Sequence, residues 1–169
     1  MSTLIAYFSH TGENVANNEV VVLEKGNTEV VAEKIHSIIG GDLYKIEEAD
    51  PYPFEYRECN NRAKREDENS ERPAIKDKVG LDMNKYDIIY LGFPIWYRSF
   101  PRIIATFLEK YDLTNKTIIP FCTNDEEYFG ISLLELESVA KGATVKEGLV
   151  VRGVNVLNSD ETIKNFLNK

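Results

Sequence analysis

The fold is decided by Leu4-Ile5-Ala6-Tyr7-Phe8-Ser9-His10-Thr11-Gly12, near the N-terminus. Its first part is apolar and β-prone, which predicts a buried strand, and its last part is abruptly small and polar. We expect a helix from Asn27, because Asn27 and Thr28 are good capping residues and Val31 and Ile35 begin an apolar face. A strand that runs into hydroxyls, a glycine and a helix N-terminus can hold a phosphate. The same residues also make ordinary strand-to-helix turns, so both interpretations stay open here.

Two better-known phosphate loops are excluded by the sequence. It contains no GxxxxGK[ST] and no GxGxxG, so the nucleoside-triphosphate loop and the dinucleotide fingerprint are both missing. The loop carries no Lys or Arg before Lys25. These features suit a single phosphate monoester that is bound tightly and not transferred.

Length and composition indicate one soluble globular domain over residues 1–169, with 43% hydrophobic and 28% charged residues. Cys59 and Cys122 lie in no CxxC motif or Cys/His cluster, so we expect no metal site and a reducing, cytoplasmic location. We find no signal sequence and no apolar run of membrane length. A net charge of −8 argues against binding nucleic acid or an anionic membrane.

An insertion, residues 13–25, separates the first strand from the first helix. It contains Val20-Val21-Val22-Leu23, and an exposed β-branched run of this kind would invite edge pairing, so we expect it to be covered or paired. Long surface insertions cost little loop entropy, so it could be a tolerated excursion. The alternative is a flap beside the phosphate site.

An edge strand is expected over 42–47, followed by a helix over 54–71 that is dense in charge. Phe54, Tyr56 and Ala63 give this helix only a narrow apolar stripe, so we expect it to be mostly solvated.

The second decisive stretch runs from Tyr86 to Pro101. Ile88 to Leu91 reads as a central parallel strand, and it ends in a loop that carries Trp96, the only tryptophan, beside Tyr97. Ligands of open α/β sheets bind outside the carboxyl ends of the strands, where the strand order reverses. These two aromatic residues could belong to the core, but at this position they favour a flat ligand stacked on a ring.

The remainder of the chain keeps the alternation of strands and helices. A strand over 116–122 leads into the loop 123–130, a helix follows over 133–140, and strand material at 145–151 precedes a closing helix over 160–169. This alternation predicts a parallel sheet covered by helices on both faces.

At three places the chain resembles the flavodoxin-like superfamily, in particular its short bacterial flavodoxin-domain members. Residues 6–12 with Gly26-Asn27-Thr28 resemble the FMN-phosphate loop, usually an unbroken Ser-x-x-Gly-Asn-Thr. Residues 91–97 resemble the loop against the isoalloxazine ring, and residues 116–123 the strand entering the second ring-binding loop. The resemblance implies a three-layer α/β fold with five parallel strands in the order 2-1-3-4-5, and FMN bound at the carboxyl edge.

The site residues implied by the resemblance fall into three groups. The phosphate ligands would be Ser9, His10, Thr11, Asn27 and Thr28. The residues that cover the flavin ring would be Pro94, Ile95, Trp96 and Tyr97. The residues at the pyrimidine edge of the ring would be Thr123, Asn124 and Tyr128. His10 could equally be a surface side chain. Because the insertion splits the phosphate loop, either Gly12-Glu13-Asn14 or Gly26-Asn27-Thr28 could supply its last residues. We favour the second set because helical periodicity follows it directly.

Three functions are consistent with the sequence. The first is an FMN-dependent oxidoreductase or quinone reductase that uses NAD(P)H; it needs no catalytic side chain because the flavin carries the chemistry. The second is a flavodoxin-type electron carrier with a redox partner protein, which an acidic surface would suit. The third is a flavin-free binding domain. The chain could also form a homodimer.

Overall fold

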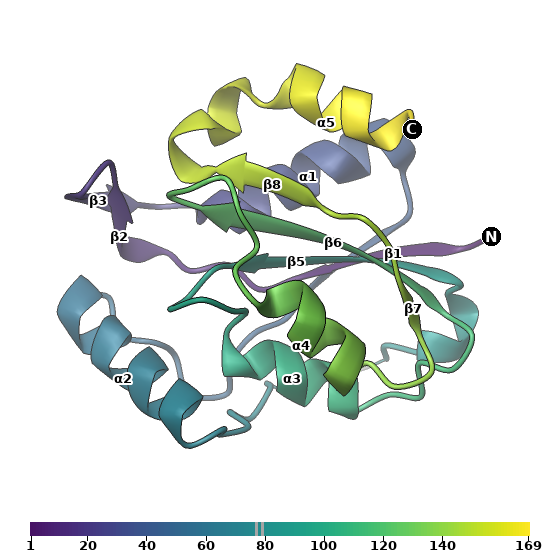
Figure 1. The fold of residues 1–169 in the computed structure, drawn as a ribbon, viewed down its shortest axis with the longest axis horizontal. Coiled ribbons are helices and arrows are strands. Elements are labelled where there is room, and N and C mark those ends of the chain that lie inside the picture. Colours follow the sequence, from purple (N-terminus) through teal and green to yellow (C-terminus); the bar gives the residue numbers. More distant parts are fainter. Residues whose placement is uncertain (77, 79) are drawn as a thin grey trace.

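A computed structural model describes residues 1–76, 78 and 80–169, and strands and helices alternate along the chain (Figure 1). The strands are β1 (Thr3–Tyr7), β2 (Gly12–Ala16), β3 (Glu19–Leu23), β4 (Asp42–Lys45), β5 (Ile88–Pro94), β6 (Thr117–Asn124), β7 (Thr144–Val145) and β8 (Leu149–Arg152). The helices are α1 (Asn27–Ile39), α2 (Tyr56–Glu68), α3 (Arg102–Glu109), α4 (Ser132–Val139) and α5 (Asp160–Leu167), with 3-10 turns η1 (Met83–Lys85) and η2 (Gly153–Asn158). Within the described ranges, no helix has the length and apolar character needed to cross a membrane.

The central sheet is parallel and has the order β4-β1-β5-β6, with β7 and β8 in turn pairing with β6 at the far edge. The expected order 2-1-3-4-5 is therefore confirmed, and the last position is filled by two short strands. The break between them contains Gly148, where an added Cβ would lie 2.5 Å from the Pro120 carbonyl oxygen. A close approach of this kind is possible only for glycine.

Helices cover both faces of the sheet, α1 and α5 on one side and α3 and α4 on the other (Figure 1). The side chains of β1 alternate between the two resulting cores: Ile5 packs with Val31 of α1, whereas Leu4 packs in the core that contains Ile103 of α3. Every β1 side chain from Leu4 to Tyr7 is buried, as expected for a central strand. All central strands point the same way, so their carboxyl ends share one edge, and the hairpin β2–β3 and α2 project beyond it.

The insertion forms an antiparallel hairpin, β2–β3. Asn17 and Asn18 join its strands with φ of 51° and 64°, a pair of positive values that is typical of a two-residue type I′ turn. The valine run is paired, as expected, but it is not covered, since Val20 and Val22 are 55% and 61% exposed.

Helix α2 is more firmly docked than its sequence suggests. The expected stripe is wrong in part, because Phe54 precedes the helix and is exposed, whereas the buried residues of α2 are Cys59, Ala63 and Glu66. Glu66 is only 2% exposed and accepts hydrogen bonds from the Tyr52 hydroxyl (2.5 Å) and Arg62 Nε (2.9 Å). The charged helix therefore docks through a satisfied polar cluster as well as through buried Cys59 and Ala63. Hydrophobic periodicity cannot reveal the polar part of this contact.

Candidate functional site

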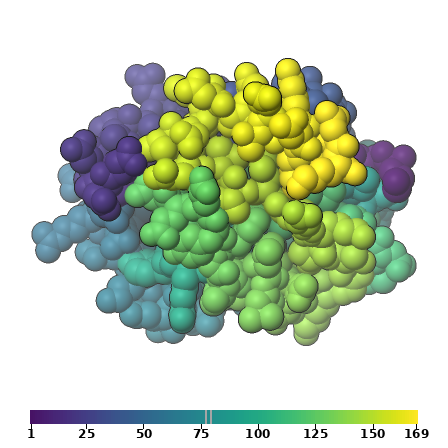
Figure 2. Space-filling view, turned by 45° about the horizontal axis from the view of Figure 1, so that its top comes forward, coloured from purple at the N-terminus to yellow at the C-terminus, as the bar shows by residue number. Residues whose placement is uncertain are grey.

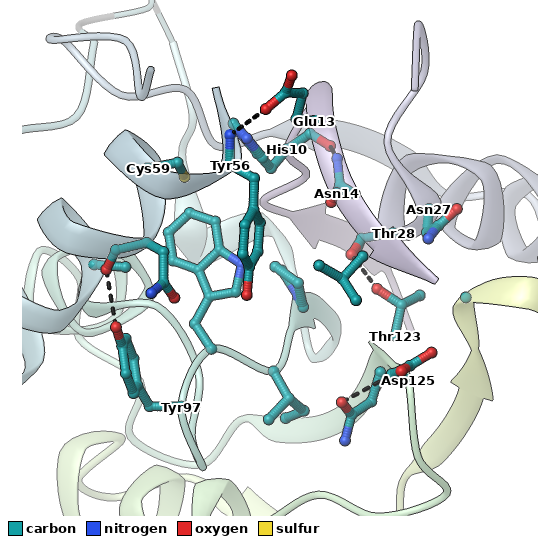
Figure 3. Close-up of a pocket in the computed structure, with 18 residues that line it drawn as sticks. His10, Glu13, Asn14, Asn27, Thr28, Tyr56, Cys59, Tyr97, Thr123 and Asp125 are labelled. Atoms are coloured by element: carbon teal, nitrogen blue, oxygen red, sulfur yellow. Dashed lines mark hydrogen bonds between the residues drawn. The ribbon is translucent and has the colours of Figure 1, made fainter. Parts of the chain in front are cut away.

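A pocket of about 190 Å³ lies at the carboxyl edge of the sheet (Figure 3). It is lined by His10, by Glu13, Asn14 and Val15 of β2, by Asn27 and Thr28 of α1, by Tyr56, Cys59, Asn60 and Ala63 of α2, by Pro94, Ile95, Trp96 and Tyr97, and by Thr123, Asn124, Asp125 and Gly153. The three loops singled out in the sequence therefore meet in one cavity. The structure adds β2 and α2 as further walls.

The N-terminus of α1 opens into this pocket, but it is not capped as expected. Gly26, not Asn27 or Thr28, is the N-cap residue, and the Ser9 hydroxyl accepts a hydrogen bond from the Glu29 N–H (3.0 Å). A Cβ on Gly26 would lie 2.1 Å from Ser9 Oγ, so glycine lets the end of β1 and the start of the helix touch. The hydroxyl of Ser9 thus caps the N-terminus of α1. Asn27 and Thr28 line the pocket at the positive end of the helix dipole.

The side chain of Thr28 is held by Thr123, which begins the loop that was predicted to bind the flavin ring from the second side. Its hydroxyl lies 2.8 Å from that of Thr123, and the two residues are 1% and 5% exposed (Figure 3). This buried hydrogen bond joins the ends of α1 and β6, which are 95 residues apart.

One ring nitrogen of His10 is buried and makes no hydrogen bond to the residues that the structure describes. This atom is Nε2, and the residue lines the pocket. Burial lowers the pKa of the imidazole below its usual 6.5. A buried ring nitrogen without a partner is costly in free energy, so this atom is available to a polar group that enters the pocket.

Trp96 stands at the centre of an aromatic cluster. Its ring meets those of Tyr52, Phe8 and His10 edge to face, with centroid distances of 4.9, 5.4 and 5.8 Å. These contacts fix the indole within the pocket instead of leaving it to swing into solvent.

The turn that carries Trp96 is closed by mutual backbone hydrogen bonds with Ser99 (2.8 and 3.3 Å). Tyr97 within it has φ of 60°, a left-handed value that a tyrosine seldom adopts. Its hydroxyl donates to the Asn60 carbonyl of α2 (2.9 Å), so the turn and the helix wall are tied together (Figure 3).

A buried arginine anchors the same turn from behind. Arg102 Nη2 donates to Ser99 Oγ (3.1 Å), to the Phe100 carbonyl (2.9 Å) and to Glu135 of α4 (2.6 Å). The Ser99 hydroxyl also donates to Glu135 (2.8 Å). The position of Trp96 is therefore set by α3 and α4 as well as by its own loop.

Sequence reasoning missed the contribution of α2. Tyr56, Cys59 and Asn60 line the pocket, although the helix was expected to be mostly solvated. The signal available in the sequence was weak, consisting of an uncharged Cys59-Asn60-Asn61 run within a charged helix. Burial raises the pKa of the Cys59 thiol to about 12, so this sulfur stays protonated and is not a nucleophile at neutral pH.

The acidic loop after β6 lies partly in the site. Asn124 and Asp125 line the pocket, whereas Tyr128 is exposed and contributes its carbonyl to Asn124 Nδ2 (3.2 Å). Thr11 is also exposed, and Ser9 faces the helix end described above. The remaining predicted residues all line the pocket, and their roles as ligands stay predictions.

No metal-binding cluster accompanies the pocket. Across residues 1–76, 78 and 80–169, no group of three or more His, Cys, Asp or Glu side chains is arranged to hold a metal ion.

Comparison with known proteins places the chain in a family. The family model for flavodoxin matches residues 2–169. The chain belongs to the flavodoxin family. Among curated proteins, none matches this flavodoxin-family chain.

Two solved structures from Bacteroides species resemble this flavodoxin-family member along nearly its whole length. A candidate flavoprotein from Bacteroides uniformis is 31% identical, with a TM-score of 0.78 over 99% of this chain and 98% of its own. Another candidate flavoprotein, from Bacteroides eggerthii, is 32% identical, with a TM-score of 0.72 over 96% and 98%. A flavoprotein from Lactobacillus acidophilus, solved in complex with FMN, shares the fold at 21% identity, with a TM-score of 0.68 over 95% and 98%.

Proposed function

We propose that this chain binds FMN non-covalently in the pocket and works as an FMN-dependent oxidoreductase, taking electrons from NAD(P)H to a quinone or a similar acceptor. The observation that carries the FMN assignment is the unbonded Nε2 of His10 in the same pocket as the N-terminus of α1 and Trp96. Membership of the flavodoxin family and the FMN complex of the Lactobacillus relative support the same cofactor.

The phosphate end of FMN suits the α1 side of the pocket. Asn27 and Thr28 sit in the first turn of a thirteen-residue helix, where free N–H groups and the helix dipole favour an anion. His10 Nε2 would donate a hydrogen bond to a phosphate oxygen. Asn14, whose Nδ2 lies 3.3 Å from the His10 carbonyl, would hold the loop around it.

The flavin ring suits the opposite part of the pocket. Pro94, Ile95 and Trp96 would cover the apolar ring, while Asn124 and Asp125 would face its polar edge. The pocket thus combines an anion-binding end with an aromatic end, as a molecule built of a phosphate and a flat ring requires.

Bound FMN would supply the redox chemistry, namely uptake of a hydride from a reduced nicotinamide and delivery of two electrons to a quinone, with the second proton of the quinol coming from solvent. The protein itself binds and orients: Trp96 is fixed by its neighbours, and the protonated thiol of Cys59 takes no part. The exposed acidic residues Glu126 and Glu127 would disfavour extra negative charge on the ring.

The test is an FMN titration of the purified apoprotein that follows the emission of Trp96, together with the same titration with riboflavin, which lacks the phosphate. We expect saturable quenching at one FMN per chain and weaker binding of riboflavin. His10→Ala should reduce the preference for FMN over riboflavin, because it removes a phosphate ligand and leaves the ring site intact. His36→Ala, in the last turn of α1, is the matched control.

NAD(P)H oxidation by the FMN-loaded protein, with a quinone present, tests the enzymatic part separately. An electron carrier would bind FMN but show no such oxidation. A folded protein that binds no FMN at tens of micromolar would instead be a flavin-free binding domain, and the redox proposal would be wrong.

A further inference from the structure

The hairpin of residues 12–23 is fastened to the walls on two sides of the pocket. At its base, the Glu13 N–H donates to the Phe54 carbonyl (2.9 Å), and Glu13 Oε2 accepts from the Tyr56 N–H (2.8 Å). The carboxylate therefore caps the N-terminus of α2, a position that favours negative charge. Gly12 packs so closely on this segment that a Cβ would lie 2.8 Å from the Phe54 carbonyl oxygen.

At its tip, the hairpin reaches the loop after β6. The Asn17 N–H donates to Asp125 Oδ1 (3.1 Å) across 108 residues of sequence. Arg152 completes the contact, with Nε donating to the Asp125 carbonyl (2.8 Å) and Nη2 to Asn17 Oδ1 (3.4 Å). Figure 2 shows the hairpin, in dark purple, against the yellow-green segment that contains Arg152.

These two attachments differ in strength. The base is held by a backbone bond, by a helix cap and by the close packing of Gly12 on Phe54. The tip is held by two hydrogen bonds of Asn17 that are exposed to water and therefore weak, one of them 3.4 Å long. We expect the tight type I′ turn and the two paired strands to move together. The hairpin is thus built to stay attached to α2 while its tip releases and re-engages.

The size of the cavity favours such a movement. Its volume of about 190 Å³ is smaller than the roughly 300–1,000 Å³ typical of small-molecule sites. Separation of the walls would make room for a ligand as large as FMN, and the weakest of the described attachments is the tip of the hairpin.

We propose that the hairpin is a strap that closes over bound FMN, latched by Asn17, Asp125 and Arg152, and that the closed walls limit the redox partners of the flavin to small molecules. This inference rests on the proposed FMN site. With β2, α2 and the Trp96 turn around bound FMN, a donor or acceptor the size of a nicotinamide or a quinone would reach the ring at the mouth of the pocket, and the surface of a partner protein would be kept away.

The first experiment measures the latch on the FMN-loaded protein without any turnover. Arg152→Ala removes two of the tip bonds, and Asn17→Gly removes one while keeping a residue that tolerates φ of 51°. We expect Arg152→Ala to speed FMN release about tenfold and to raise quenching of flavin fluorescence by iodide, with a smaller effect of Asn17→Gly. Arg72→Ala is the matched control, since Arg72 also donates to backbone carbonyls and a carboxylate, but far from the site.

The second experiment tests the class of redox partner. The FMN-loaded protein is reduced anaerobically with dithionite and mixed with menadione, which takes two electrons and two protons, or with cytochrome c, which takes one electron per molecule. We expect wild type to reduce menadione much faster than cytochrome c, and Arg152→Ala to raise the cytochrome c rate at least threefold relative to the menadione rate.

Each part of the proposal can fail separately. If wild type retains FMN but neither variant changes FMN release or iodide quenching, the latch is wrong. If wild type reduces cytochrome c as fast as menadione, the restriction to small partners is wrong. If wild type binds no FMN at all, the proposed function itself fails, which is a different result.

Discussion

The hydrogen bond between Thr28 and Thr123 gives the sharpest stability prediction. Thr28→Val removes one hydroxyl with little change of shape and leaves the hydroxyl of Thr123 buried without its partner. The 2.8 Å separation and the 1% and 5% exposure leave almost no room for water to replace the bond. The expected loss is the desolvation cost of one unpaired hydroxyl, about 1–3 kcal/mol in the free energy of unfolding.

The double variant Thr28→Val/Thr123→Val removes both partners and leaves neither unpaired. We therefore expect it to lie within about 1 kcal/mol of wild type, so that the two substitutions are far from additive. The assay is urea unfolding of the apoprotein, and Thr144→Val on the exposed short strand β7 is the control, expected within about 0.5 kcal/mol of wild type. A single variant as stable as wild type, or a double variant whose loss equals the sum of the two single losses, would refute the reasoning.

Three further predictions concern charged groups. Burial lowers the pKa of His10 below 6.5, so the unfolded chain binds more protons there, and stability should fall as the pH drops from 6.5 toward that lowered pKa. His10→Gln should flatten this part of the stability–pH curve in urea unfolding between about pH 5 and 7.5; identical slopes would contradict the burial. Glu126→Gln/Glu127→Gln should raise the flavin reduction potential by on the order of 10–40 mV at low salt and less at high salt, by potentiometric titration; an unchanged or lowered potential would count against it. Arg102→Met should lower the free energy of unfolding in urea by about 2–4 kcal/mol, because it leaves the partly buried carboxylate of Glu135 without its ion-pair partner. Arg102→Met/Glu135→Gln should recover part of that loss. No recovery would mean that the ion pair is not the cause.

The sheet and its order could be predicted because they depend on local patterns. Ile88 to Leu91 is apolar on both faces, as a central parallel strand must be, and the strand observed there extends to Pro94. The carboxyl ends of such strands share one edge, so the loops at His10, Trp96 and Thr123 were expected to meet, and all three line one pocket.

The details of the helix ends could not be predicted in the same way. Thr28 was expected to cap α1, but its hydroxyl bonds Thr123 instead, and Ser9 takes the helix N–H. Thr123 lies 95 residues from Thr28, and Ser9 lies 20 residues from Glu29, whose N–H it accepts. Capping propensity is a local property and therefore gave the wrong residue.

The sequence alone determined the strand and helix pattern, the edge of the sheet at which the pocket lies and the resemblance that implies FMN, because hydrophobic periodicity and loop motifs depend on residues close together in the chain. Only the tertiary structure decided that α2 and the hairpin wall the pocket. Those walls depend on Glu13 at the start of α2 and on Arg152 beside Asn17, contacts between residues 43 and 135 positions apart. Polar contacts over such separations leave no periodic trace in a sequence, and it is folding that brings the groups together.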